Sequence, residues 1–122
     1  MHLSELIHVL QIHQPHIVFL QETWLDASVE NIRIDGYNIV SRRDRKATAN
    51  RGGLLTLQRQ DFNCLVHIKN CEMEERSLHF LRVDVETFLV INWYRPGSSD
   101  HDGFQELYKE LKMYTGQISE KA

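Results

Sequence analysis

The chain has 122 residues, of which 42% are hydrophobic and 25% charged, a composition that suits one globular domain or part of a larger one. The formal net charge of −3 gives no reason to expect nucleic-acid binding through bulk electrostatics. No apolar run is long enough for a membrane span, and two cysteines form neither a zinc pattern nor a disulfide framework. We therefore expect an intracellular protein of the nucleus or cytoplasm, not a secreted one, with no membrane partner.

The first predicted element is an amphipathic helix at 3–13, where apolar residues recur at helical spacing until Pro15 ends the element. The segment 16–22, HIVFLQE, is a short and nearly continuous apolar run. Such a run is typical of a strand that is covered on both faces. A helix, a short turn and a buried strand make half of an α/β unit.

Short strands are predicted through the rest of the chain, separated by turn-like or charged segments. They lie at 37–42, 53–59, 63–69, 77–85 and 88–94. The short connections favour antiparallel pairing of neighbours, including a hairpin that turns at 61–63. A last helix follows, with an apolar stripe formed by Phe104, Leu107, Tyr108, Leu111 and Tyr114.

This order of elements predicts the α/β (α+β) class, with a mixed but largely antiparallel sheet and flanking helices. No repeat or linker divides the chain, so 1–122 is interpreted as a single domain. A sheet with this much apolar surface normally needs a second layer on its other face. We therefore expect the chain to be an incomplete domain.

A basic segment lies between Ser41 and Gln60. It contains six basic residues and one acidic residue, which gives a local charge of +5. The basic residues are Arg42, Arg43, Arg45, Lys46, Arg51 and Arg59. In an otherwise acidic chain, such a segment is a candidate phosphate-binding surface. The alternative is a solvated hairpin with no ligand.

Two predicted strands end in polar residues that are candidates for catalysis or ligand binding. Glu22 follows the apolar run, and a carboxylate at a strand end of an α/β sheet is either a surface residue or a metal ligand. Tyr94 and Arg95 end the last strand, where Pro96 forces the chain out of the sheet. A phenol and a guanidinium at this position suit phosphate recognition, although two polar edge residues would look the same.

Four motifs in order resemble the endonuclease/exonuclease/phosphatase superfamily. They are IVFLQETWL (17–25), GYNIVSRRDR (36–45), RGGLLTLQR (51–59) and VINWYRPG (90–97). Within the superfamily, the match is closest to the apurinic-type endonuclease domain of non-LTR retrotransposons, and it spans residues 3 to about 111. The resemblance implies a four-layer α/β-sandwich, of which this chain would be the N-terminal half.

The resemblance also implies site residues, a cofactor and partners. Glu22 matches the ligand of Mg²⁺, which Mn²⁺ can replace, and Tyr94 matches the catalytic residue that contacts the scissile phosphate. The candidate nucleic-acid-binding residues are Arg42, Arg43, Arg45, Arg51 and Arg95. The implied partners are the DNA phosphate backbone and the remainder of a polyprotein that carries a reverse transcriptase.

Other parts of the family pattern are missing or displaced. The first strand with its Asn is absent, and so is Gly-Asp-x-Asn downstream of Tyr94. The sequences DFN at 61–63 and SDH at 99–101 have matching letters in the wrong order along the chain. We therefore interpret Asp100 and His101 as a loop leading into the last helix. Gly97 stands where some family members carry a phosphate-binding Asn.

The leading hypothesis is the N-terminal portion of a Mg²⁺-dependent DNA endonuclease domain that hydrolyses phosphodiesters. We expect this chain to be inactive alone, because loss of one positioned catalytic group typically costs about 10²–10⁴-fold in rate. One alternative is the phosphatase or phosphodiesterase branch of the same superfamily. Another is a non-catalytic remnant that binds nucleic acid through its arginines.

Overall fold

The computed structural model describes residues 3–44, 52–70, 75–94, 108–109 and 112–113. Its elements are α1 (Leu3–His13), β1 (Ile17–Gln21), β2 (Tyr37–Arg43), β3 (Leu54–Arg59), β4 (Leu65–Asn70), β5 (Glu75–Val83) and β6 (Glu86–Tyr94). The predicted first helix and all six predicted strands are confirmed, with ends shifted by at most two residues. The predicted last helix lies mostly outside the described residues, although 108–109 and 112–113 are helical.

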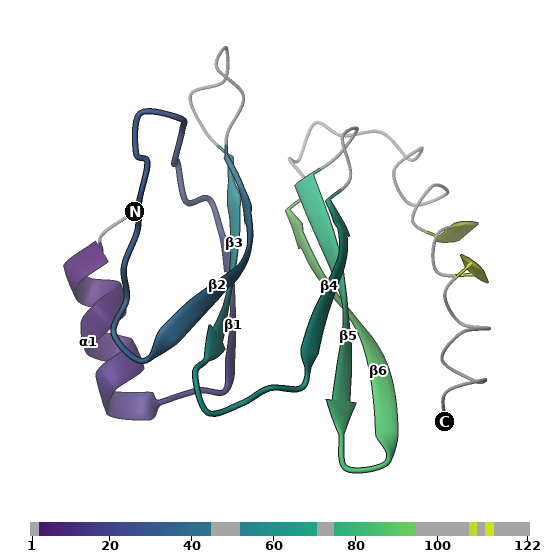
Figure 1. The fold of residues 1–122 in the computed structure, drawn as a ribbon. Helices are drawn as coiled ribbons and strands as arrows, with labels where there is room; N and C mark the ends of the chain where they lie inside the picture. Colours follow the sequence, from purple (N-terminus) through teal and green to yellow (C-terminus); the bar gives the residue numbers. More distant parts are fainter. Residues whose placement is uncertain (1–2, 45–51, 71–74, 95–107, 110–111, 114–122) are drawn as a thin grey trace.

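The strands form two three-stranded antiparallel sheets, in the orders β1-β3-β2 and β4-β5-β6. The helix α1 covers one face of the first sheet, and the second sheet lies against its other face (Figure 1). The described residues therefore form an α+β arrangement of three layers. Their four strand pairings are all antiparallel, so no mixed sheet is present in this part of the chain.

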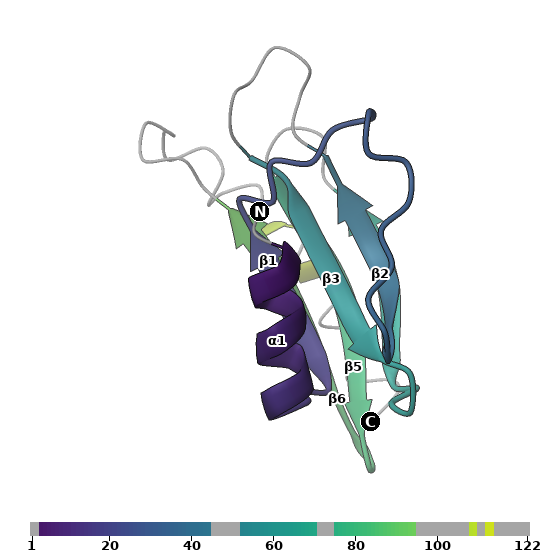
Figure 2. The same ribbon diagram turned by 90° about the vertical axis from the view of Figure 1, so that its left-hand side faces the viewer.

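The helix α1 ends where the backbone turns into a left-handed conformation. Gln14 has a φ of 46° and donates its backbone N–H to the carbonyl of Leu10 at 2.9 Å. Pro15 follows and has no N–H with which to continue the helix. The helix then lies over the β1 side of the first sheet, while the connection from β1 descends beside β2 (Figure 2).

The centre of the first sheet is β3, and this strand, not the 16–22 segment predicted to be covered on both faces, is the one with fully buried residues. Leu54, Leu55, Thr56 and Leu57 are at most 1% exposed, because α1 covers one face of β3 and the second sheet the other. In contrast, β1 is an edge strand of this sheet, and its burial is only partial. An apolar run indicates a strand, but the number of paired edges decides which strand is central.

The predicted hairpin at 61–63 is wrong. The connection between β3 and β4 passes from the first sheet to the second, and the two strands do not pair. Both edges of β3 are already occupied, by β1 and β2. A short connection favours antiparallel pairing only when an edge is free to pair.

The surface between the two sheets contains a polar inter-sheet layer, formed by Thr56, Ser77, His79 and Asn92. All four side chains are at most 1% exposed. His79 Nε2 lies 3.1 Å from Ser77 Oγ and 3.5 Å from Thr56 Oγ1. On the opposite face of the first sheet the core is apolar, with Leu10 from α1 packed into it.

Candidate active site at the ends of β1 and β6

Two hydrogen bonds join the C-terminal end of β1 to that of β6. Gln21 Nε2 donates to the backbone carbonyl of Trp93 at 2.5 Å. Asn92 Nδ2 donates to the carbonyl of Leu20 at 3.2 Å. Both contacts bridge 72 positions of sequence, so they depend on the packing of one sheet on the other.

These contacts bring two of the predicted site residues to one end of the two sheets. Glu22 directly follows Gln21, and Tyr94 directly follows Trp93 as the last residue of β6. Both side chains are half-buried. A carboxylate and a phenol thus stand at strand ends on the same side of the two sheets, and strand ends of α/β proteins are where ligands commonly bind.

The backbone after β1 turns sharply against the start of β3. The N–H of Thr23 donates to the carbonyl of Gly53 at 3.4 Å, and the N–H of Trp24 donates to that of Gly52 at 2.9 Å. Within the turn, Trp24 Nε1 donates a hydrogen bond of 2.5 Å to Glu22 Oε2. The Glu22 carboxylate is thus oriented by a neighbouring side chain.

Gly53 allows this close approach. Its φ is +101°, and a Cβ added there would lie 2.3 Å from Thr23 Oγ1, far inside van der Waals contact. The glycine pair of the RGG motif therefore has a steric function: it lets the β1 turn sit directly on the first residues of β3.

Arg42 has an internal role. Its Nη2 donates to the carbonyls of Val29 at 2.5 Å and Asp26 at 3.1 Å, and its Nη1 donates to that of Glu30 at 3.3 Å. Its Nε also pairs with Asp44 Oδ1 at 2.6 Å. The guanidinium therefore fastens the connection between β1 and β2 to the end of β2.

Arg43 lies at the same end of the first sheet as Glu22. Leu54 pairs with Gln21 on one side and with Arg43 on the other, so the three residues form one row across the sheet. The Arg43 side chain is half-buried. The other candidate arginines, Arg45, Arg51 and Arg95, lie outside the described residues.

Glu22 is a candidate ligand for a cation at this end of the described structure. The described part of the chain contains no group of three or more His, Cys, Asp and Glu residues suited to hold a metal ion. Mg²⁺ does not need such a group, since it retains several waters and binds through one or two carboxylates plus substrate phosphate. A half-buried carboxylate oriented by an indole N–H fits that mode of binding.

Of the two displaced motifs, DFN at 61–63 lies away from this end of the molecule and SDH at 99–101 lies outside the described residues. Asp61 follows the C-terminal end of β3, which is antiparallel to β1 and so ends away from Glu22. Its carboxylate pairs with Arg59 Nε at 2.6 Å, and this hydrogen bond lowers the pKa of Asp61. Asp100 and His101 lie outside the described residues.

Sequence reasoning assigned no role to His79, which the structure buries completely. Burial, reinforced by the nearby His67, lowers the pKa of His79 to about 4. The ring also packs against Phe19 of β1, with ring centroids 6.0 Å apart. Strand alternation was the available signal, since it places Ser77 and His79 on the same face of β5.

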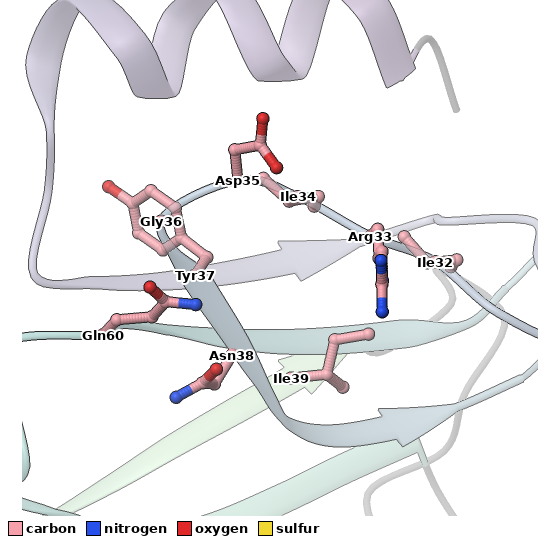
Figure 3. A pocket seen from close by; sticks show the side chains of 9 residues that line it. All are labelled: Ile32, Arg33, Ile34, Asp35, Gly36, Tyr37, Asn38, Ile39 and Gln60. Atoms are coloured by element: carbon pink, nitrogen blue, oxygen red, sulfur yellow. The ribbon is translucent and has the colours of Figure 1, made fainter.

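A hollow of about 690 Å³ opens beside the start of β2 (Figure 3). It is lined by Ile32, Arg33, Ile34, Asp35, Gly36, Tyr37, Asn38, Ile39 and Gln60. Tyr37 pairs with Arg59, so the hollow lies at the opposite end of the first sheet from Glu22. It contains none of the predicted site residues.

Comparisons with known proteins gave no matching family model, no matching curated protein and no matching solved structure. Within the described residues, no helix is long and apolar enough to cross a membrane.

Proposed function

We propose that this chain is the N-terminal portion of a Mg²⁺-dependent DNA endonuclease domain of the endonuclease/exonuclease/phosphatase type, as in non-LTR retrotransposons. The supporting observation is the pair of bonds from Gln21 to Trp93 and from Asn92 to Leu20. They hold the ends of β1 and β6 together, where the motifs assign the metal ligand and the phosphate contact. In this proposal, α1 and the two sheets are three layers of a four-layer α/β-sandwich.

The chemistry assigned to the chain is binding and orientation. Glu22 would hold Mg²⁺ or Mn²⁺, which when bound stabilises the negative charge that develops on the phosphate. Tyr94 would donate its phenolic O–H to a phosphate oxygen, and Arg43 would add positive charge at the same end. The sequence has no residue in the family order for the Asn, Asp and His of the pattern, so we expect cleavage by this chain alone to be negligible.

The alternative of a remnant that binds nucleic acid through its arginines is less well supported. Arg42, one of the five candidate nucleic-acid-binding arginines, uses its guanidinium on three carbonyls and on Asp44. A residue committed in this way has little capacity for phosphate. The phosphomonoesterase branch would use the same Glu22 and Tyr94, and it differs from the nuclease in its substrate.

The direct test is Mn²⁺ titration followed by paramagnetic broadening of backbone amide signals. We expect broadening around Glu22 and Tyr94, reduced by Glu22→Gln. Glu86→Gln is the matched control, because Glu86 starts β6 at the far end from Tyr94. Equal broadening in wild type and Glu22→Gln would contradict the proposed metal site.

A second measurement separates the substrates. A short DNA duplex and an inositol phosphate are each titrated with Mg²⁺ present and with EDTA. The nuclease proposal expects Mg²⁺-dependent changes at the Glu22 end with DNA, and weaker ones with the inositol phosphate. In parallel, supercoiled plasmid should stay intact, and nicking that disappears in EDTA and in Glu22→Gln would show that our expectation of inactivity is wrong.

A further inference from the structure

The turn after β1 contains two residues in a conformation that L-amino acids rarely adopt. Glu22 has a φ of 57° and Trp24 a φ of 59°, and neither is glycine. Such a conformation is energetically unfavourable for these residues and persists only where surrounding contacts enforce it. Residues in such strained conformations are concentrated at functional sites. Two of them in one turn therefore make the turn a candidate functional element.

The contacts that enforce the turn come from the residue between these two and from β3. Thr23 is 2% exposed, and its side chain lies where Gly53 would otherwise carry a Cβ. The backbone N–H groups of Thr23 and Trp24 bond to the two glycines before β3. The conformation of the turn is therefore fixed by its contacts with the residues before β3.

Burial of the Trp24 ring does not explain its position. The side chain is 55% exposed, although a tryptophan usually contributes to stability through the large area it buries. What the turn does achieve is a short bond between Trp24 Nε1 and Glu22 Oε2, at 2.5 Å. With two left-handed residues flanking Thr23, the chain brings this indole back onto the carboxylate two positions earlier.

We propose that Trp24 is a positioning residue for Glu22: its indole N–H fixes the orientation in which the carboxylate meets a divalent cation. This inference rests on the proposed function for the identity of the cation. Partners that hydrogen-bond a metal ligand orient it and typically contribute about 10–100-fold to metal affinity. The Trp24 indole is a partner of this kind for Glu22.

The contact is tested first without metal, by the Nε1–H signal of Trp24 in amide spectra. Glu22→Gln should shift this signal, because a charged acceptor is replaced by a neutral one, and Glu86→Gln should leave it unchanged. A Trp24 signal that is insensitive to Glu22→Gln overturns the proposal. This measurement needs no variant of Trp24, so it does not depend on how such a variant folds.

The second test is a double-mutant cycle on Mn²⁺ affinity. Trp24→Phe keeps an aromatic ring and removes the N–H, so it should weaken Mn²⁺ binding about tenfold, the lower end of the usual range. In the Glu22→Gln background the same change should have no effect. A merely structural role would lower the melting temperature of both backgrounds without this dependence on Glu22.

The outcomes separate the two proposals. If Glu22→Gln weakens Mn²⁺ binding but Trp24→Phe binds Mn²⁺ as wild type does, the positioning role is wrong and the metal site stands. If Glu22→Gln binds Mn²⁺ as wild type does, the proposed metal site is wrong, whatever the Trp24 signal does. Loss in Glu22→Gln together with Glu22-dependent weakening in Trp24→Phe supports both.

Discussion

Asn92 on β6 donates a hydrogen bond of 3.2 Å to the backbone carbonyl of Leu20 on β1, so a fully buried amide joins the two sheets. The same Nδ2 lies 3.4 Å from Thr56 Oγ1 on β3. Buried polar groups are costly unless they are bonded, and once bonded they specify one arrangement of the elements around them. Asn92 therefore sets how β6 meets β1, and with it the spacing of the candidate site.

We predict that Asn92→Ala destabilises the protein by about 2 kcal/mol, since it leaves buried acceptors without their donor and opens a small space. Asn38→Ala, on the exposed side of β2, is the control and should cost much less. Urea unfolding measures both. Similar losses of stability in the two variants would contradict the linking role of Asn92.

Stability should fall in mildly acidic solution because of His79. The pKa of His79 in the folded protein is about 4, below the ordinary 6.5, so the unfolded chain takes up the proton first as the pH drops. The contribution of the neutral ring to the free energy of unfolding is thus complete above about pH 6.5 and is lost progressively toward pH 4. The largest possible loss of the free energy of unfolding from this residue is about 3 kcal/mol.

His79→Gln should therefore flatten the dependence of the free energy of unfolding on pH between about pH 7 and about pH 5. His8→Gln is the control, because His8 is exposed on α1. Urea unfolding curves across this range provide the measurement. If His79→Gln retains the wild-type slope, other groups cause the acid sensitivity.

The glycines offer a matched pair of substitutions. Gly53→Ala should be strongly destabilising, because the strained backbone, with φ of +101°, is combined with a Cβ 2.3 Å from Thr23 Oγ1. Gly36 has a φ of +85°, but a Cβ added there would meet open space. Gly36→Ala should therefore lower the free energy of unfolding only through backbone strain, by about 1–2 kcal/mol. Melting temperatures that are equal for the two variants would be inconsistent with the close contact at Thr23.

Arg42→Ala should act mainly on stability. Loss of its bonds to the carbonyls of Asp26, Val29 and Glu30 frees the connection between β1 and β2, at a cost of about 1–3 kcal/mol. Arg33→Ala, at an exposed position, is the control. Thermal unfolding tests the difference between the two variants. An unchanged melting temperature in Arg42→Ala would contradict the structural role and make Arg42 a candidate DNA-binding residue again.

Local patterns in the sequence were sufficient to locate the helix and the strands, but turn positions depended on single residues. The pattern around VDVETF suggested a break at 86–87, whereas the turn lies at Asp84 and Val85. Asp84 adopts a φ of 55°, which Asp tolerates better than most residues do. Alternation continues through this segment, so periodicity alone does not identify the turn.

The positions of the elements, and the places of Glu22 and Tyr94 at strand ends, can be predicted from local patterns, because periodicity and turn residues act over a few positions. The central position of β3, the membership of β4 in a second sheet and the location of Glu22 and Tyr94 at the same end became visible only in the folded chain. Those features depend on which strand edges remain free and on contacts such as Gln21 with Trp93, which join residues far apart in the chain. They follow from packing two sheets together, and no short stretch of sequence contains that information.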